Sequence, residues 1–565
     1  MPISSKSRPG PNLPDCSSRD PRTKLVDQMF SRWDKKDTPG CVIAIIKDGN
    51  IIYKRAYGMA DLERDVALTT KSVFELGSMS KQFLAMCILL LIEEGKISLD
   101  DDIRKYIQEF PDYGYKITIK NLIYHTSGIR DYYELMSLAG MPVFNHYTAK
   151  QALDIIVRQK DLNFNPGDEH LYSNSGYFLL GIIVKRIVGE LLGEYAQKNI
   201  FKPLNMDSTL YYDNFTRIVK NRAIGYFSKN DGGYGIGISL FDIVGDGGVL
   251  STVEDLFRWD QNLFKNKLGR DPMKISQQYF TTGILNNGKE LKYAFGLRID
   301  TYKGFKLITH GGGWCGYQSQ INHFPEHNFS IIYLSNLEDF EPMALINNIT
   351  DIYLKSPLII ETQKAISHTS TKSKIVKFSE TILKEKAGTY RNPQTGQIWR
   401  LLVKNKKLEV KTSYSSIFQM IPINNKEFQL LNASEDMQVI FFKSNKSKNK
   451  PKRLQIKIEG EEPNFYEYVL PISRSPLQLE EYTGNYYCNE LESTYTIIIK
   501  NNKLVYLIKF LEESITLEPT FKDEFVDNDH VFRFTRNKNG LISGFNAWTD
   551  RIKPILFKKK LQLLN

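Results

Sequence analysis

Four residues near position 80 have the types and spacing of an activated nucleophile. They are Ser78, Met79, Ser80 and Lys81, a Ser-x-x-Lys pattern. At the start of a helix this spacing puts the first and last side chains one turn apart on the same face. Serine is a poor nucleophile, but a nearby amine that is partly desolvated and deprotonated can accept its proton. The pattern therefore predicts Ser78 as nucleophile and Lys81 as its proton acceptor.

The same pattern has an ordinary structural explanation, in which Ser78 caps a helix and Lys81 is exposed to solvent. The residues that follow favour chemistry, because residues 83–92 are apolar without interruption. A lysine directly before such a run does not fit a solvated helix face. We therefore predict a buried helix over residues 78–94 that ends at Gly95. The free N–H groups at the N-terminus of this helix can stabilise an oxyanion.

A second candidate group is Tyr172, Ser173 and Asn174, in a loop before a helix expected at residues 175–198. A tyrosine in such a loop can hold or relay a proton. Because tyrosine titrates near 10, this role requires a neighbouring positive charge, which Lys81 could supply. The structural alternative is that Tyr172 packs on the helix entry and Asn174 caps the helix.

A third group is His310, Gly311, Gly312 and Gly313, followed by Trp314. It comes at the end of a β-rich run at residues 305–309. Glycines let a substrate approach the strand backbone closely, and an N–H group there can complete an oxyanion hole. The structural alternatives are a glycine-rich turn and a histidine with an ordinary packing role.

The elements that must position these groups indicate an α/β (α+β) fold. Strands come first, helices follow and strands return, which predicts an antiparallel sheet flanked by helices on both faces. Asp48, Gly49 and Asn50 predict a hairpin between the first two strands. The expected strands are residues 42–46, 51–53, 295–299, 305–309, 318–324 and 330–334, and the expected helices are residues 78–94, 149–159 and 175–198.

The C-terminal third differs from the rest of the chain in its predicted secondary structure, and its sequence contains an internal repeat. Short β-rich runs with Asn, Lys and Gly turns predict all-β, barrel-like domains. Residues 387–410 align without a gap on residues 483–506, matching Gly388 with Gly484 and Tyr390 with Tyr486. At 565 residues the chain is also too long for one hydrophobic core. We predict a disordered tail (1–20), a catalytic domain (21–360), a linker (361–380) and two β-barrel-like domains (381–475 and 476–565).

The charge balance does not indicate a nucleic-acid partner. The net charge is +11, and the strongest basic cluster is residues 443–453, between two strand-like runs. This position favours a solvated hairpin loop over a nucleic-acid site. With 41% hydrophobic and 25% charged residues, the composition is that of a folded globular protein.

The cysteine pattern and the N-terminal residues predict a reducing, cytoplasmic setting. The five cysteines are far apart and form no metal-binding spacing, so neither disulfides nor a metal site is expected. Residues 1–20 contain no apolar core of a signal peptide. The longest apolar run, residues 83–92, falls far short of the ~20 residues needed to cross a bilayer. No cofactor, membrane or nucleic acid is predicted as a partner.

Taken together and in this order, the three groups resemble the motifs of the penicillin-recognising serine hydrolases. That superfamily includes class C β-lactamases, D,D-carboxypeptidases, D-aminopeptidases and related esterases, with Ser-x-x-Lys, Tyr-x-Asn, and Lys-Thr-Gly or His-x-Gly. Here the motifs read SMSK, YSN and HGG. Flanking phrases such as FELGSMSKQF, HTSG and NPGDEHLYSNSGY are also similar, and the resemblance covers about residues 25–345.

The resemblance implies a role for each residue. Ser78 would be acylated, while Lys81 and Tyr172 would share the proton transfers to the leaving group and from water. The backbone N–H groups of Ser78 and Gly313 would form the oxyanion hole. His310 would shape the pocket and tune the charge around Tyr172. The remaining predicted contacts to a small-molecule or short-peptide substrate are Asn174, Gly311, Gly312 and Trp314.

The resemblance also narrows the expected reaction. His310 stands where β-lactamases use a lysine to attract the substrate carboxylate, which favours a peptidase, amidase or esterase. Two β-barrel domains after the catalytic domain resemble the architecture of D-aminopeptidases, in which a barrel loop restricts the active site. The alternatives are a β-lactamase and a catalytically silent binding or scaffold protein of the same fold. Homo-oligomeric assembly is left open.

Overall fold

The computed structural model describes residues 20–354 except 143, 230 and 341, and residues 378–560 except 394–395, 405, 413–416, 431–436, 444–450, 459–462, 470–475, 510–512 and 528–529. The predicted tail at 1–20 and linker at 361–380 therefore lie almost entirely outside the described residues. The chain divides into two compact units: residues 1–99, 180–284 and 290–365 form the first, and residues 100–179, 285–289 and 366–565 form the second.

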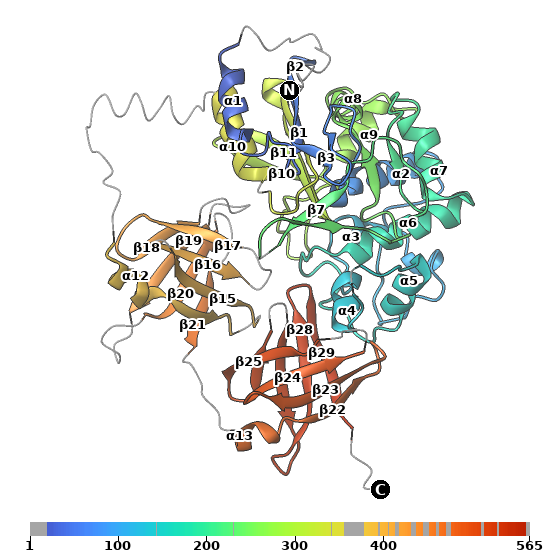
Figure 1. The fold of residues 1–565 in the computed structure, drawn as a ribbon. Helices are drawn as coiled ribbons and strands as arrows, with labels where there is room; N and C mark the ends of the chain where they lie inside the picture. The colour runs from blue at the N-terminus through green and yellow to red at the C-terminus, as the bar shows by residue number, and fades with distance from the viewer. Residues whose placement is uncertain are drawn as a thin grey trace, which may run out of the picture. The chain divides into compact units, whose positions relative to one another are not determined.

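The first unit is built on a six-stranded antiparallel sheet of order β10-β11-β12-β13-β1-β2 (Figure 1). β1 pairs with both β2 and β13, so the sheet is assembled from the two ends of the predicted catalytic region. This confirms the predicted antiparallel sheet. The strands are β1 (Cys41–Lys47), β2 (Asn50–Tyr57), β10 (Arg298–Tyr302), β11 (Phe305–Trp314), β12 (Tyr317–Phe324) and β13 (Phe329–Ser335).

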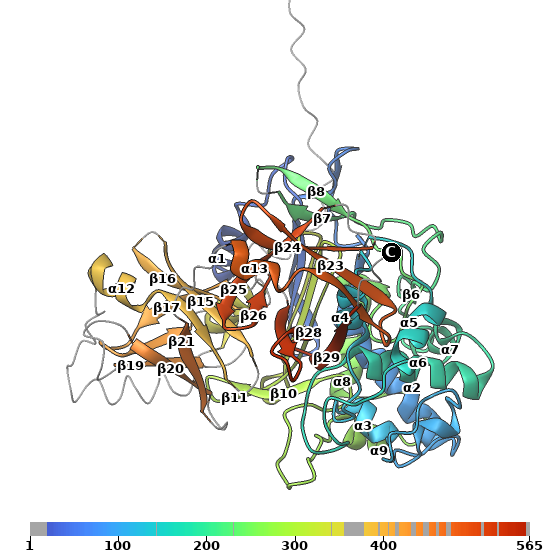
Figure 2. The same ribbon diagram turned by 90° about the horizontal axis from the view of Figure 1, so that it is seen from below.

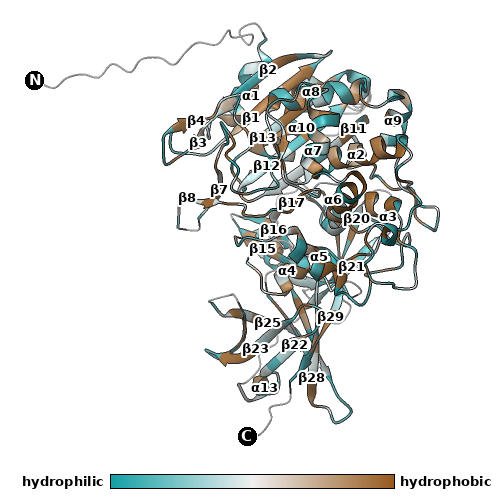
Figure 3. Ribbon diagram, turned by 90° about the vertical axis from the view of Figure 1, so that its right-hand side faces the viewer, coloured by the Kyte–Doolittle hydropathy of each residue, from teal (hydrophilic) through white to brown (hydrophobic). Residues whose placement is uncertain are grey.

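Helices cover both faces of this sheet, as predicted. On one face, α1 (Arg22–Phe30) and α10 (Pro342–Tyr353) share a core with β1 and β13 that includes Phe30, Ile43 and Ile349. The alternate β1 residue Val42 is also fully buried, and α8 (Val253–Phe264) contacts β1 and β13. Figure 3 colours much of this region brown, the hydrophobic end of its scale. Burial on both faces accounts for the continuous apolar sequence of β1.

The other elements around this sheet are short. The predicted helix at 78–94 is present as a 3-10 turn, η1 (Gly77–Ser80), followed by α2 (Lys81–Glu93). The remaining elements are β3 (Met59–Asp61), β4 (Val66–Ala67), β5 (Phe74–Glu75), β6 (Leu210–Tyr211), β7 (Gly225–Ser228), β8 (Tyr234–Gly237), β9 (Val249–Ser251), α7 (Leu192–Ala196), η3 (Gln197–Phe201), α9 (Pro272–Tyr279) and η4 (Pro325–His327).

Three predicted elements differ from the structure. The helix expected at 175–198 is interrupted: α6 (Asn174–Val188) ends before Gly189, whose φ of 74° breaks the helix. The strand expected at 295–299 begins only at Arg298, because Gly296, with φ of 70°, makes a turn before it. β11 does not stop at Thr309 but continues through the three glycines to Trp314.

The second unit combines short helices with two barrels. The helices of its first part are η2 (Ile103–Lys105), α3 (Ile119–Ile123), α4 (Tyr132–Leu138) and α5 (Ala149–Val157). Thr148 and Gln151 form a capping box at the start of α5, which explains why the predicted helix begins at residue 149. α12 (Glu380–Lys386) and α13 (Pro476–Glu480) precede the barrels.

Two closed eight-stranded barrels follow, as predicted, and carry the orange and red ends of the colour scale in Figures 1 and 2. The first consists of β14 (Gly388–Arg391), β15 (Ile398–Lys404), β16 (Lys407–Thr412), β17 (Ile417–Pro422), β18 (Glu427–Leu430), β19 (Met437–Lys443), β20 (Pro451–Ile458) and β21 (Asn464–Val469). The second consists of β22 (Gly484–Cys488), β23 (Ser493–Lys500), β24 (Lys503–Ile508), β25 (Ile515–Phe521), β26 (Glu524–Val526), β27 (Val531–Arg536), β28 (Ile542–Thr549) and β29 (Ile552–Lys559).

The internal repeat is visible in matching details of the barrels. Gly388 and Gly484 open their barrels with φ of 138° and 134°. The Tyr390 hydroxyl donates to the carbonyl of residue 386 at 2.9 Å, and the Tyr486 hydroxyl donates to the carbonyl of residue 482 at 2.7 Å. The runs flanking the basic segment are the paired strands β19 and β20, while residues 444–450 lie outside the described residues.

Two further findings concern the predicted setting of the chain. Within the described residues, no helix combines the length and apolar character that a membrane crossing requires. The four cysteines of the described ranges, Cys41, Cys87, Cys315 and Cys488, are free thiols and buried.

Candidate active site

Ser78 and Lys81 lie side by side at the start of α2. Ser78 is in the 3-10 turn and Lys81 is the first residue of the helix proper. The Lys81 Nζ donates to the Ser78 Oγ at 3.0 Å and to the backbone carbonyl of Asp246 at 2.7 Å. Lys81 is 0% exposed, so the alternative of a solvated lysine does not hold. A buried amine in contact with a serine hydroxyl can exchange a proton with it.

The glycines of β11 bring its backbone against the turn that carries Ser78. A Cβ atom on Gly312 would lie 2.0 Å from the carbonyl oxygen of Leu76 and 2.7 Å from the Ser78 nitrogen. A Cβ on Gly77, whose φ is +50°, would lie 2.8 Å from the Gly313 nitrogen. Only glycines permit this approach. It places the backbone nitrogens of Ser78 and Gly313 in neighbouring segments, as a two-donor oxyanion hole requires.

His310 is held by two hydrogen bonds that define its tautomer. Its Nδ1 lies 2.6 Å from the carbonyl oxygen of Gly311, and its Nε2 lies 3.0 Å from the Tyr293 hydroxyl. A carbonyl only accepts, so Nδ1 carries the proton and Nε2 of the neutral ring accepts from Tyr293. Burial, reinforced by the charge of Lys81, lowers the pKa of His310 to about 4. His310 is therefore neutral at neutral pH, and its contacts favour a role in positioning β11.

Trp314 closes the glycine segment of β11. Its Nε1 donates to the Ser239 Oγ at 2.8 Å, and its ring meets Phe241 edge to face at 5.1 Å between centroids. The half-buried indole is thereby fixed on its polar edge and on one face. Gly311 and Gly312 precede it in the strand with partly exposed backbones.

Tyr172 and Asn174 belong to the second unit. The Tyr172 ring lies on His125 with centroids 4.2 Å apart, and His125 Nδ1 accepts from the backbone N–H of Ser173 at 3.1 Å. The Asn174 backbone N–H donates to Asp131 Oδ2 at 2.6 Å, at the first residue of α6. His125 and Asp131 therefore fix the backbone that carries the Tyr-x-Asn group.

Several residues in these surroundings were missed by sequence reasoning. His125 lies within the HTSG phrase, but nothing local indicates that it stacks on a tyrosine. Tyr293 precedes the turn at Gly296 and carries no motif. The contact of Asp246 with Lys81 uses a backbone carbonyl, which leaves no sequence signal. Arg551 approaches Tyr172 from the second barrel, and only the tertiary structure reveals it.

The model of the family described as Beta-lactamase matches residues 26–352, which is more than half of the chain. The chain belongs to the beta-lactamase family. Penicillin-binding protein 4* of Bacillus subtilis is 30% identical over 338 residues, covering 56% of this chain and 72% of that protein. A D-aminopeptidase of Brucella canis is 27% identical over 300 residues, covering 53% of this chain and 57% of that protein.

Solved structures agree with the fold of this beta-lactamase family member. An octameric penicillin-binding protein homologue from Pyrococcus abyssi has a TM-score of 0.55 and 22% identity, covering 79% of this chain and 100% of that chain. FmtA from Staphylococcus aureus has a TM-score of 0.51 and 21% identity, covering 62% and 92%. Within the family the chain is a serine hydrolase, in agreement with the contact between Ser78 and Lys81.

Proposed function

We propose that the chain cleaves peptide or amide bonds of small substrates through an acyl-enzyme on Ser78, as a D-aminopeptidase-like or D,D-peptidase-like enzyme. The observation that carries the proposal is the Lys81 Nζ at 3.0 Å from the Ser78 Oγ, beside the glycine segment of β11. The relatives named D-aminopeptidase and penicillin-binding protein support this substrate class.

The resemblance to the family assigns a step of the reaction to each of these groups. Ser78 attacks the substrate carbonyl while Lys81 and Tyr172 share the transfer of its proton to the leaving amine. The N–H groups of Ser78 and Gly313 stabilise the oxyanion, and loss of one such donor typically costs about 3 to 4 kcal/mol. Water then releases the acyl group through the same pair. Asn174, Gly311, Gly312 and Trp314 hold the substrate.

β-Lactam hydrolysis is the second candidate, and His310 weighs against it. A residue at this position that attracts a carboxylate must be positively charged, whereas the pKa of His310, lowered to about 4, leaves it neutral. In addition, both ring nitrogens of His310 already form hydrogen bonds, one with Gly311 and one with Tyr293. We therefore expect β-lactams to acylate Ser78 more slowly than small amides or esters do.

The test is mass spectrometry of the full chain after exposure to a fluorophosphonate, with Ser78→Ala as control. Turnover of D-aminoacyl amides, D,D-peptides, short esters and their L counterparts then defines the substrate class. We expect one adduct on Ser78 and a preference for D substrates. Absence of the adduct would contradict the proposal that the chain is an enzyme acting through Ser78. A preference for L substrates would overturn the D-peptidase assignment.

We also propose that a loop of the second barrel restricts the substrate, as the resemblance to D-aminopeptidases implies. The hairpin between β28 and β29 reaches the segment that carries Tyr172, within the second unit. Deletion of residues 381–565 tests the idea poorly, because it would expose the surface of α4 that the second barrel covers. The Tyr495 hydroxyl of that barrel donates to the carbonyl of Leu138 at 3.0 Å. Single substitutions in the hairpin are a cleaner test. Homo-oligomeric assembly, which the sequence leaves open, has a precedent in the octameric Pyrococcus abyssi homologue.

A further inference from the structure

The turn between β28 and β29 consists of Asp550 and Arg551 and is fixed to the segment near Phe164. The Asn163 Nδ2 donates to the carbonyl of Arg551 at 2.8 Å, and Asn163 Oδ1 accepts from the backbone N–H of Lys553 at 2.8 Å. One side-chain amide thus pairs with the hairpin as a neighbouring strand would. The position of the Arg551 side chain is therefore set by backbone hydrogen bonds on both sides of it.

The Arg551 guanidinium lies over Tyr172. Its Cζ is 5.1 Å from the Tyr172 ring centroid, and its Nη1 is 3.7 Å from Asp131 Oδ2. Asp131 is 0% exposed and also accepts the backbone N–H of Asn174. One buried carboxylate therefore links the arginine to the Tyr-x-Asn backbone, so that movement of either is opposed by the other.

Arg551 carries a positive charge at neutral pH. Burial, the largest influence, lowers the pKa of Arg551, but the negative groups around it, Asp131 and Glu134 first, outweigh it and raise that pKa. The Arg551 side chain as a whole is 33% exposed. This positive charge lies over the face of the Tyr172 ring, in cation–π geometry.

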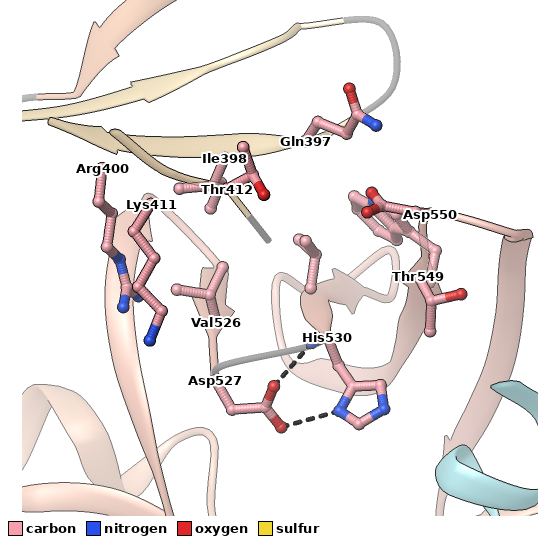
Figure 4. Close-up of a pocket in the computed structure, with 12 residues that line it drawn as sticks. Gln397, Ile398, Arg400, Lys411, Thr412, Val526, Asp527, His530, Thr549 and Asp550 are labelled. Atoms are coloured by element: carbon pink, nitrogen blue, oxygen red, sulfur yellow. Dashed lines mark hydrogen bonds and ion pairs between the residues drawn. The ribbon is translucent and has the colours of Figure 1, made fainter. Parts of the chain in front are cut away.

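The far side of the hairpin packs against the first barrel. Gln397 and Ile398 of the first barrel, with Thr549 and Asp550 of the hairpin, line a cavity of about 30 Å³ (Figure 4). This volume holds one or two water molecules and no substrate. Figure 4 also shows Asp527 bound to His530, whose Nδ1 lies 2.9 Å from Asp527 Oδ2. Ile398 of the first barrel and Trp548 of β28 also share a buried apolar cluster, so this end of the hairpin contacts the first barrel.

We propose that Arg551 is a positioning residue through which the second barrel makes Tyr172 competent in proton transfer. The inference rests on the proposed function, in which Tyr172 shares the proton traffic of Ser78. When Tyr172 gives its phenol proton to the leaving amine, negative charge develops on its oxygen, and the guanidinium stabilises that charge. When the phenolate takes up the proton that Lys81 accepted from Ser78, the starting state is restored. The barrel therefore supplies a charge to the reaction in addition to any barrier to large substrates.

The experiment compares Arg551→Met and Arg551→Lys in the full chain, with Lys553→Met as the matched control. Lys553 is on the same hairpin and pairs with Glu169 at 2.9 Å, but both side chains are about half exposed, at 47% and 54%. We expect Arg551→Met to lower kcat for a D-aminoacyl amide by about 10- to 100-fold with little change in KM, because a residue that acts through a proton-transfer group contributes less than the ~10²- to 10⁴-fold of that group itself. Arg551→Lys should recover most of the loss, and Lys553→Met should show none.

Two further measurements make the result decisive. In a Tyr172→Phe background, Arg551→Met should have almost no additional effect, since the arginine acts through the phenol. Thermal unfolding of each variant separates this effect from loss of structure. An increase in KM at unchanged kcat, failure of Arg551→Lys to recover activity in a folded protein, or full additivity with Tyr172→Phe would overturn the inference. Failure of the wild-type chain to form an adduct on Ser78 would instead overturn the proposed function.

Discussion

The amine of Lys81 lies 3.0 Å from the hydroxyl oxygen of Ser78, at the point where a 3-10 turn becomes a helix. Neither residue could adopt this relationship on an exposed helix, where a lysine extends into water. Lys81 is fully buried, and its amine donates a second hydrogen bond to the Asp246 carbonyl. The pair is the centre of the proposed reaction, and the first prediction tests it.

Replacement of Lys81 by methionine should slow acylation of Ser78 by about a thousandfold or more, because the serine loses its proton acceptor. The rate of fluorophosphonate labelling, followed by mass spectrometry, measures the change. Lys96→Met is a suitable control, since Lys96 lies past the other end of α2 and is about half exposed, at 49%. Labelling of Lys81→Met at the wild-type rate would remove Lys81 from the mechanism.

Two neighbouring glycines should respond differently to alanine. Gly312→Ala puts a Cβ 2.0 Å from the carbonyl oxygen of Leu76, so β11 must move away from the Ser78 turn. For Gly313→Ala the nearest atoms all belong to the side chain of Gln318, at 3.0 Å or more, and this side chain can rotate. We expect kcat to fall about 100- to 1000-fold for Gly312→Ala, the scale of a lost oxyanion donor, and less than about tenfold for Gly313→Ala. Equal losses in steady-state turnover would contradict this geometry.

His310 should make the stability of the fold depend on pH. Its folded pKa of about 4 lies below the ordinary 6.5, so the unfolded chain takes up the proton first as the pH falls. Its contribution is complete above about pH 6.5 and is lost as the pH falls from there to about 4, by up to ~3 kcal/mol. Urea unfolding of the wild type and of His310→Gln at several pH values measures this loss. The same slope in both proteins would show that His310 does not cause it.

Two glutamates in one turn of the second barrel should differ in their effect on stability. Glu490 pairs with Arg130 at 2.8 Å, with side-chain exposures of 15% and 4%. Glu492 pairs with Arg158 at 3.1 Å, but these side chains are 60% and 33% exposed. Glu490→Gln leaves a buried arginine without its counter-charge and should destabilise the protein by about 3 kcal/mol, against about 0.5 kcal/mol for Glu492→Gln. Similar unfolding midpoints for the two variants would contradict the prediction.

The sequence was sufficient for the fold class because its signals are local and repeated. β1 is continuously apolar since both its faces are covered, and Gly388 and Gly484 mark equivalent positions with positive φ in two barrels. Boundaries were less accurate. Gly189 divides a helix whose apolar pattern continues on either side, and the pattern of β11 does not show that a strand runs through three glycines.

By itself the sequence determined the nucleophile candidate, the order of its motifs and the two-barrel tail, because residue type and short-range spacing specify helix starts, strand runs and repeats. Only the tertiary structure decided that Lys81 is buried against Ser78, that Tyr293 holds His310 as a neutral ring, and that Arg551 lies over Tyr172. The contacts of His310 and Tyr172 join separate segments of the chain, and the burial of Lys81 depends on distant residues such as Asp246, so no local pattern specifies them.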